Sequence, residues 1–146
     1  PIPVYDLKAA ASAFSEEQDP QAKGTVYLSH RKARRPGLFV AQIVGRSMDR
    51  VAPDGSWCLW QHVNAVDVPA PAPGELVLVR RSDPNDQNLG GFTFKRWVQR
   101  SSGYVLEPMS HDPRFMPIAL GADDNDLTFV ARFIELLHIG EEDIVG

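Results

Sequence analysis

The sequence predicts a mainly β domain with little helix, and three observations lead to this prediction. The 146 residues include 12 prolines and 11 glycines, a density that suits short strands joined by turns. Several short runs rich in β-branched and aromatic residues stand directly beside these turn residues. No stretch of about 12 to 20 residues combines a helical period with capping residues at both ends.

The expected strands are apolar runs that begin at a glycine or directly after one. In chain order they are Leu38–Val44, Ser56–Trp60, Glu75–Arg80, Gly91–Val98 and Gly103–Glu107. A last apolar stretch covers residues 127–139. It starts with Thr128-Phe129-Val130, which favours a strand, although residues 133–137 would also suit a helix. We predict a strand there.

Segments outside these strands are expected to be loops or terminal arms. Residues 66–73 and 82–91 are rich in turn-forming residues, and the second segment would cap a hairpin between Arg81 and Phe92. Residues 7–18 contain an alanine run without large apolar residues at helical spacing, so a short helix and a flexible arm both remain open.

The chain length fits one ordinary domain. The expected division is an N-terminal arm over residues 1–25, one domain over residues 26–140 and an acidic tail over residues 141–146. Residue 1 is proline rather than methionine. We therefore expect either a processed chain or a domain cut from a longer protein.

Composition and charge exclude several classes of protein. Hydrophobic residues make up 43% of the chain and charged residues 23%, so a disordered or collagen-like chain is excluded. We expect neither a membrane span, which takes ~20 apolar residues, nor a secretory signal. The net charge of −4 gives no general attraction to nucleic acid. The single cysteine, Cys58, cannot form an internal disulfide and favours a reducing, cytoplasmic compartment.

The charged clusters are more simply explained as solvated loops than as binding sites. The basic segment His30–Arg35 could contact phosphates or an acidic partner, but it contains no interleaved aromatic residue, so direct DNA binding is not expected. Acidic residues at 16–17 and 123–126 are also expected in surface loops. Cys58 has no cysteine or histidine partner at metal-ligand spacing, so we expect no metal and no cofactor.

The strongest local motif is Gly45-Arg46-Ser47-Met48-Asp49, which places a serine at the end of an expected strand. A side chain in that position can point into a cleft. The motif is not the Gly-x-Ser-x-Gly elbow of α/β-hydrolases, because Asp49 replaces the second glycine and no helical pattern follows. A serine that caps a turn is the simpler alternative. As a nucleophile, Ser47 would need a base.

Lys95 is the best candidate for that base. The four histidines (His30, His62, His111 and His138) have no carboxylate at a spacing that marks a catalytic triad. A lysine base must be neutral, whereas about 1 in 2,500 unperturbed lysines is neutral at pH 7. Lys95 is the one lysine inside an apolar run, where desolvation favours the neutral amine. Strand alternation leaves open a solvent-facing Lys95 with no chemical role.

Together, these motifs resemble the LexA/UmuD family of self-cleaving serine peptidases. The matching segments are Gly45-Arg46-Ser47-Met48, Pro53-Asp54-Gly55-Ser56, Pro73-Gly74-Glu75-Leu76-Val77-Leu78-Val79 and Phe94-Lys95-Arg96-Trp97. Residues 105–108 and 112–118 also resemble the strand and turn that follow the family's lysine. The resemblance covers roughly positions 38–134 and implies that family's fold of short, bent antiparallel sheets.

The resemblance implies a Ser-Lys dyad with Ser47 as nucleophile and Lys95 as general base. By the same resemblance, the backbone N–H groups of Arg46 and Ser47 would form the oxyanion hole. The substrate would be the chain's own N-terminal arm, cut between Ala11 and Ser12, where Ser12 replaces the family's usual glycine. The resemblance also implies a homodimer, stimulation by a RecA-type filament and a role in a regulated stress response.

Two other functions remain open from the sequence. A non-catalytic sensing or docking module would keep the fold, hold the arm in the cleft and report its occupancy to a larger protein. A signal-peptidase relative acting in trans is disfavoured because no membrane anchor is expected.

Overall fold

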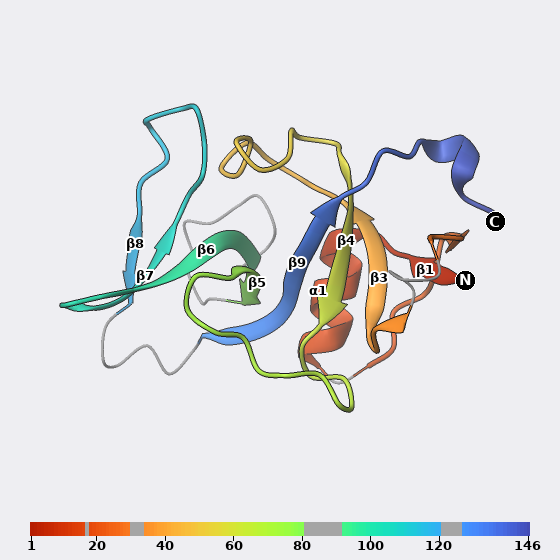
Figure 1. Cartoon of the computed structure of the whole chain (residues 1–146), viewed down its shortest axis with the longest axis horizontal. Helices are drawn as coiled ribbons and strands as arrows, with labels where there is room; N and C mark the ends of the chain where they lie inside the picture. The colour runs from red at the N-terminus through yellow and green to blue at the C-terminus, as the bar shows by residue number, and fades with distance from the viewer. Residues whose placement is uncertain (17, 30–33, 81–91, 121–126) are drawn as a thin grey trace.

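The computed structural model describes residues 1–16, 18–29, 34–80, 92–120 and 127–146 (Figure 1). The chain is mainly β, as the sequence predicts. The described strands are β1 (Ile2–Val4), β2 (Gly24–Val26), β3 (Leu38–Gln42), β4 (Trp57–His62), β5 (Leu76–Arg80), β6 (Phe92–Arg100), β7 (Gly103–Glu107), β8 (Ile118–Leu120) and β9 (Thr128–Leu136). They are joined by helix α1 (Leu7–Ser15) and a short 3-10 turn, η2 (Glu141–Asp143). Within the described residues, no helix is long and apolar enough to cross a membrane.

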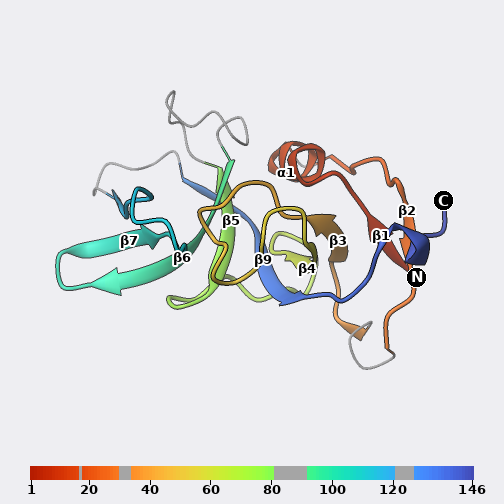
Figure 2. The same ribbon diagram turned by 90° about the horizontal axis from the view of Figure 1, so that it is seen from above.

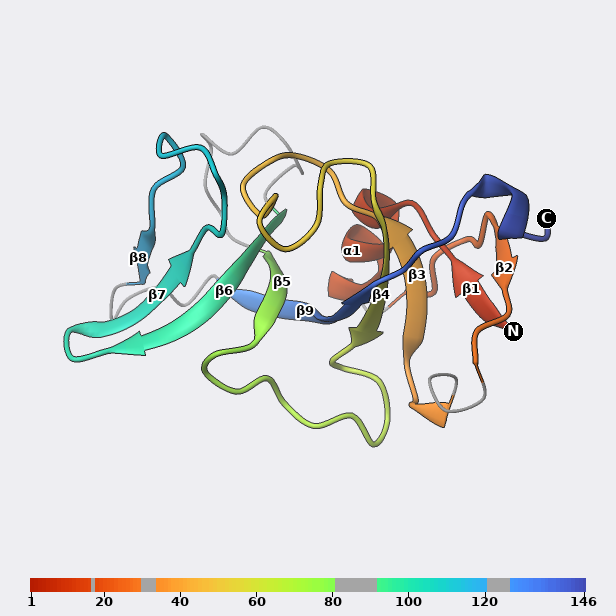
Figure 3. The ribbon, with the colours of Figure 1, turned by 45° about the horizontal axis from the view of Figure 1, so that its top comes forward.

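All nine strands belong to one mixed sheet in the order β2-β1-β3-β4-β9-β5-β6-β7-β8. Figures 2 and 3 show β6, β7 and β8 extending to one side of the molecule and β1 and β2 to the other. The wholly antiparallel arrangement that we expected is wrong at one position, because β1 runs parallel to β3, with Val4 opposite Val40. A parallel pair needs a long crossover connection, and here α1 and β2 lie in it.

The six strands predicted from the sequence are all present, with ends that differ by a few residues. The structure adds β1, β2 and β8, which have three residues each and are too short for an alternating pattern to reveal them. Antiparallel pairing of β5 with β6, with Arg80 opposite Phe92, agrees with the expected hairpin. Its loop over residues 82–91 lies outside the described residues.

The largest core cluster lies between the sheet and α1. Trp60 of β4 is fully buried at its centre and donates its indole N–H to the carbonyl of Ala41, 3.3 Å away. The Trp60 ring meets Phe94 and Phe133 edge-on, with ring centroids 4.9 Å and 5.6 Å away. This geometry favours aromatic pairs and fixes β4, β6 and β9 relative to one another.

Residues 1–25 do not form a separate arm. β1 pairs with β2 and β3, and α1 begins at Asp6, whose carboxylate accepts the N–H of Ala9 at 2.9 Å. Leu7, Ala10 and Ala11 are buried on the face of α1 that packs against the core. This spacing matches one face of a helix, but the small alanine side chains conceal it in the sequence. The expected acidic tail is also attached, because Val145 and Thr25 exchange two backbone hydrogen bonds of 2.8 Å.

The last turn of α1 rests on a histidine. The Phe14 ring stacks on His62 of β4 with centroids 3.9 Å apart and planes 14° apart. Beside this contact lies a cavity of about 260 Å³, lined also by Gln18, Asp19 and Asn64. Burial lowers the pKa of His62 below its usual 6.5, and the charge of Asp19 opposes this effect. His62 Nε2 is buried without a hydrogen-bond partner in the described structure.

We expect the protein to lose stability as the pH falls below about 6.5. Because the pKa of His62 is lower in the folded chain than in the unfolded one, the unfolded chain binds more protons between these two values. Thermal unfolding at pH 7.5 and pH 5.5 should show a smaller pH effect in His62→Phe, which keeps a stacking ring. Removal of the exposed His138 by His138→Gln is the matched control. An unchanged pH dependence in His62→Phe would contradict this assignment.

Candidate active site

The structure brings together the serine and the lysine that the sequence singled out. Ser47 follows β3 at the start of a series of turns, and Lys95 lies in the middle of β6. Lys95 Nζ donates a hydrogen bond to Ser47 Oγ at 2.7 Å. Ser47 is partly exposed, whereas Lys95 is only 8% exposed. The pair therefore has an accessible hydroxyl backed by a buried amine.

Lys95 lies in a part of β6 whose side chains are buried on both faces of the sheet. β6 lies between β5 and β7, and its residues from Phe92 to Lys95 are all buried. Phe92 and Phe94 point into the core cluster beneath α1, and Lys95 lies opposite Val77 of β5 in the sheet register. Both faces of β6 are covered at this end, which alternation in the sequence could not indicate. Removal of an ammonium group from water disfavours its charged form.

Two more acceptors orient the Lys95 amine. Nζ donates to Thr93 Oγ1 at 2.9 Å and to the carbonyl of Phe94 at 3.1 Å. With two N–H bonds directed to these oxygens, the lone pair of a neutral amine can face Ser47 Oγ. Thr93 was not among the predicted site residues. Its signal in the sequence is its position two residues before Lys95, on the same face of a strand.

A pair of tight turns shapes the loop that carries Ser47. Gly45 has a φ of +97°, a left-handed conformation that favours glycine, and its N–H donates to Asp54 Oδ1 at 2.9 Å. Asp54 precedes Gly55, whose N–H returns to the carbonyl of Ile43 at 2.9 Å. The Pro-Asp-Gly segment noted in the sequence therefore closes the loop that carries Ser47.

The two amides proposed for an oxyanion hole make no hydrogen bond among the described residues. In the part of the chain that the structure describes, neither the N–H of Arg46 nor that of Ser47 donates to a protein acceptor. The carbonyl of Arg46 accepts the N–H of Asp49 at 3.2 Å, which closes the turn. Met48 is buried in the core cluster next to these amides.

The candidate scissile bond is not presented to Ser47. Ala11 and Ser12 lie inside α1, Ala11 is 1% exposed, and the carbonyl of Ser12 accepts the Ser15 hydroxyl at 2.9 Å. No described hydrogen bond joins either residue to Ser47. The helix does share its core cluster with Met48, so α1 lies on the same side of the sheet as the nucleophile turn. Attack on this bond would require α1 to unwind.

No other described candidate from the sequence joins this site. His30 and the acidic residues at 123–126 lie outside the described residues. Cys58 is a buried free thiol, and burial raises its pKa to about 12. No group of three or more potential metal ligands occurs among the described residues.

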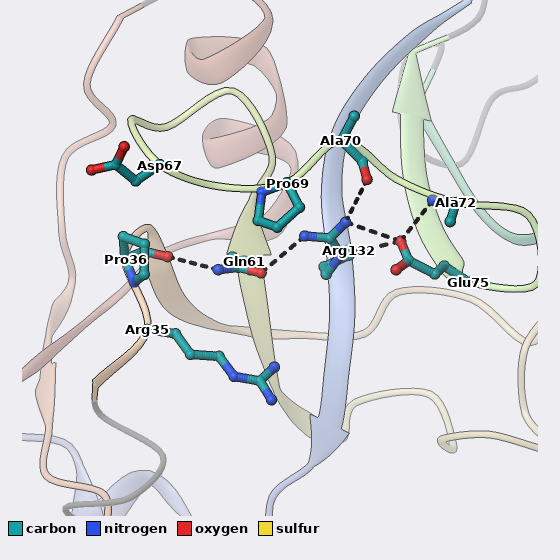
Figure 4. A pocket seen from close by; sticks show the side chains of 9 residues that line it. All are labelled: Arg35, Pro36, Gln61, Asp67, Pro69, Ala70, Ala72, Glu75 and Arg132. Atoms are coloured by element: carbon teal, nitrogen blue, oxygen red, sulfur yellow. Dashed lines mark hydrogen bonds and ion pairs between the residues drawn. The ribbon is translucent and has the colours of Figure 1, made fainter.

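A second polar cluster, absent from our sequence predictions, surrounds Arg132 on β9 (Figure 4). Arg132 is 9% exposed; its guanidinium donates to Glu75 Oε2, Gln61 Oε1 and the carbonyl of Ala70, each at 3.1 Å. These bonds tie β4, β5 and the loop over residues 66–73 to β9. The adjoining cavity has a volume of about 540 Å³. Its lining includes two arginines, Arg35 and Arg132, and two acidic residues, Asp67 and Glu75. The arrangement is that of a structural crosslink.

Comparison of the chain with protein-family models gives no match, and comparison with curated proteins gives none either. The geometry around Ser47 is therefore the main indication of function.

Proposed function

We propose that this chain is a serine peptidase domain of the LexA/UmuD type, with Ser47 as nucleophile and Lys95 as general base. The observation that carries the proposal is the 2.7 Å contact between Ser47 Oγ and the buried Nζ of Lys95. A nucleophile within hydrogen-bond distance of a base that is itself oriented by further groups is the usual sign of an activated serine. Thr93 and Phe94 supply that orientation here.

The proposed reaction proceeds by acyl transfer. Neutral Lys95 accepts the hydroxyl proton of Ser47 as Oγ attacks the carbonyl carbon of the substrate, and the N–H groups of Arg46 and Ser47 stabilise the resulting oxyanion. Loss of one such donor costs about 2.7–4 kcal/mol in other enzymes. Lys95 then returns the proton to the leaving amine, and water hydrolyses the acyl-enzyme by the same route. No metal or cofactor takes part in these steps.

The proposed substrate is the chain's own Ala11–Ser12 bond. A tethered bond has a high effective concentration, which would offset a weakly activated dyad. Since this bond lies in α1, one slow cut would follow a rare unwinding of the helix, which suits a regulatory switch. The proposal includes a cytoplasmic location, which the single cysteine favours. It also includes homodimerisation and stimulation by a RecA-type filament, which the family resemblance implies.

The second candidate function is a non-catalytic docking module. The observation that favours it is the packing of α1 against the core, with Ala11 buried and Phe14 stacked on His62. In this case α1 would be a permanent part of the core and Ser47 would never meet a substrate.

Self-cleavage should be faster at pH 10 than at pH 7. The neutral fraction of a lysine base increases with pH until the amine has titrated, and the cleavage rate should increase with it. Mass spectrometry of the incubated chain should then show a fragment of residues 12–146. An intact chain at both pH values, with and without a RecA-type filament, would exclude the self-cleaving peptidase and leave the docking module.

A further inference from the structure

We propose that Asp49 is a positioning residue for Ser47, acting by locking residues 109–112 against the turn that carries the nucleophile. This inference rests on the proposed peptidase function. Asp49 belongs to the motif that singled out Ser47 in the sequence, but neither the dyad nor the oxyanion hole uses its side chain.

The lock consists of hydrogen bonds between two segments that are far apart in the sequence. Asp49 Oδ1 accepts the N–H of His111 at 2.8 Å. On the same pair of segments, the N–H of Met109 donates to the carbonyl of Ser47 at 2.9 Å, and the N–H of Arg50 donates to the carbonyl of Met109 at 2.8 Å. Two backbone bonds and one carboxylate bond therefore join residues 47–50 to residues 109–111.

The Asp49 carboxylate supplies the side-chain hydrogen bond between these two segments. Asp49 is a carboxylate at neutral pH, and hydrogen bonds from the His111 amide and then from the Ser110 side chain lower its pKa below the usual value. Ser110 Oγ in turn accepts the N–H of Asp112 at 3.0 Å, which continues the network along the segment. A charged acceptor gives stronger hydrogen bonds than a neutral one.

The lock acts on the reacting group through the Ser47 carbonyl. The Met109 N–H also lies 3.3 Å from Met48 Sδ, so one amide fixes both the peptide plane after Ser47 and the buried side chain beside it. That peptide plane helps to determine where Ser47 Oγ stands relative to Lys95 Nζ. Catalytic geometry tolerates displacements of about 0.5 Å, so a loosened turn slows the chemistry without altering the titration of Lys95.

Substitution of Asp49 tests this inference. The readout is the rate at which a fluorophosphonate probe labels Ser47, because labelling needs the activated serine but not the unwinding of α1. Asp49→Ala should lower the labelling rate about 10-fold or more and leave its pH midpoint unchanged. Asp49→Asn should retain part of the rate, because its amide oxygen can still accept the His111 N–H. Both variants should keep the wild-type circular dichroism spectrum.

Asp112→Asn is the matched control, since it removes the same charge directly beside the locked residues 109–111. The Asp112 carboxylate bonds to Arg114 in its own loop, so labelling should proceed at the wild-type rate. A second measurement follows hydrogen exchange of the amides of residues 109–111, which should quicken in Asp49→Ala but not in Asp112→Asn.

Four outcomes separate the inference from the proposed function. Wild-type labelling in a folded Asp49→Ala overturns the positioning role, as does equal slowing in Asp112→Asn. If Asp49→Ala does not fold, an Asp49→Asn protein that folds and labels at the wild-type rate overturns it as well. If the wild-type chain is neither labelled nor cleaved, the peptidase proposal fails and the positioning role fails with it. Exchange at residues 109–111 then reports only a structural lock.

Discussion

Replacement of Ser47 or Lys95 by alanine should abolish self-cleavage, with a fall of at least about 10³-fold in rate at pH 7 and pH 10. Ser47→Ala removes the proposed nucleophile, and Lys95→Ala removes the only group placed to accept its proton among the described contacts of Ser47 Oγ. The two residues act as one unit, so the double variant should be no slower than either single variant.

The matched control for Lys95 is another lysine. Lys23 is exposed on the N-terminal side of β2, and Lys23→Ala should cleave at the wild-type rate. Lys95→Arg should also be inactive, because a guanidinium stays protonated and cannot serve as a base. Lys95→Met, which fills the buried site with an apolar chain of similar length, separates loss of the base from loss of the fold.

Cleavage products can be followed by mass spectrometry over several days at both pH values. A fragment of residues 12–146 that accumulates in Ser47→Ala or in Lys95→Ala at the wild-type rate would contradict the dyad. Cleavage that is lost in Lys95→Ala but kept in Lys95→Met would contradict the role of the amine and leave only a packing role.

The sequence was sufficient to identify the two residues of the dyad as candidates, because each occupies a distinctive local setting. Ser47 follows a glycine at the end of a strand, and Lys95 is the one lysine within an apolar run. What the sequence could not decide was which face of β6 is buried. That depends on what packs against the strand: Phe92 and Phe94 join the core cluster shared with α1, and the turn that carries Ser47 contacts Lys95. Such tertiary neighbours leave no trace in the alternation of one strand.

Other parts of the fold escaped prediction for separate physical reasons. The face of α1 is formed by small side chains, whose burial depends on the close approach of the sheet rather than on a visible apolar stripe. β1 and β8 pair with the longer strands β3 and β7, whereas β2 pairs with β1 and forms a bridge to Val145. Pairing rather than their own propensity holds these three strands. The Arg132 cluster joins residues up to 71 positions apart, and no local sequence pattern predicts such a contact.

Truncation of Phe14 should speed self-cleavage of the otherwise intact chain by roughly 30-fold. Phe14 anchors the last turn of α1 between three rings, with centroid distances of 6.0 Å to Tyr5, 5.3 Å to Phe39 and 3.9 Å to His62. Phe14→Ala removes these contacts from a half-buried position, at a cost of about 2 kcal/mol to the docking of α1. Each 1.4 kcal/mol changes an equilibrium constant about 10-fold, so the undocked helix should become about 30 times more populated.

The reason for a faster reaction is that the candidate bond must leave the helix before Ser47 can reach it. If unwinding of α1 is a rapid equilibrium that precedes the cut, the observed rate is proportional to the population of the unwound form. Lys8→Ala changes an exposed residue on the same helix and should leave the rate unchanged. The Phe14→Ala substitution placed in the Ser47→Ala background should quicken hydrogen exchange across α1 with no cleavage at all.

These measurements decide between the two proposed functions of the domain. Faster exchange across α1 together with faster cleavage supports a helix that must open to become a substrate. Faster exchange with an unchanged, measurable cleavage rate would show that the cut bond lies outside α1, and the assignment of Ala11–Ser12 would be wrong. Faster exchange with no cleavage in any variant, at pH 7 or pH 10, would favour the docking module. In that module, release of α1 from its contact with His62 would be the signal, and no bond would be cut.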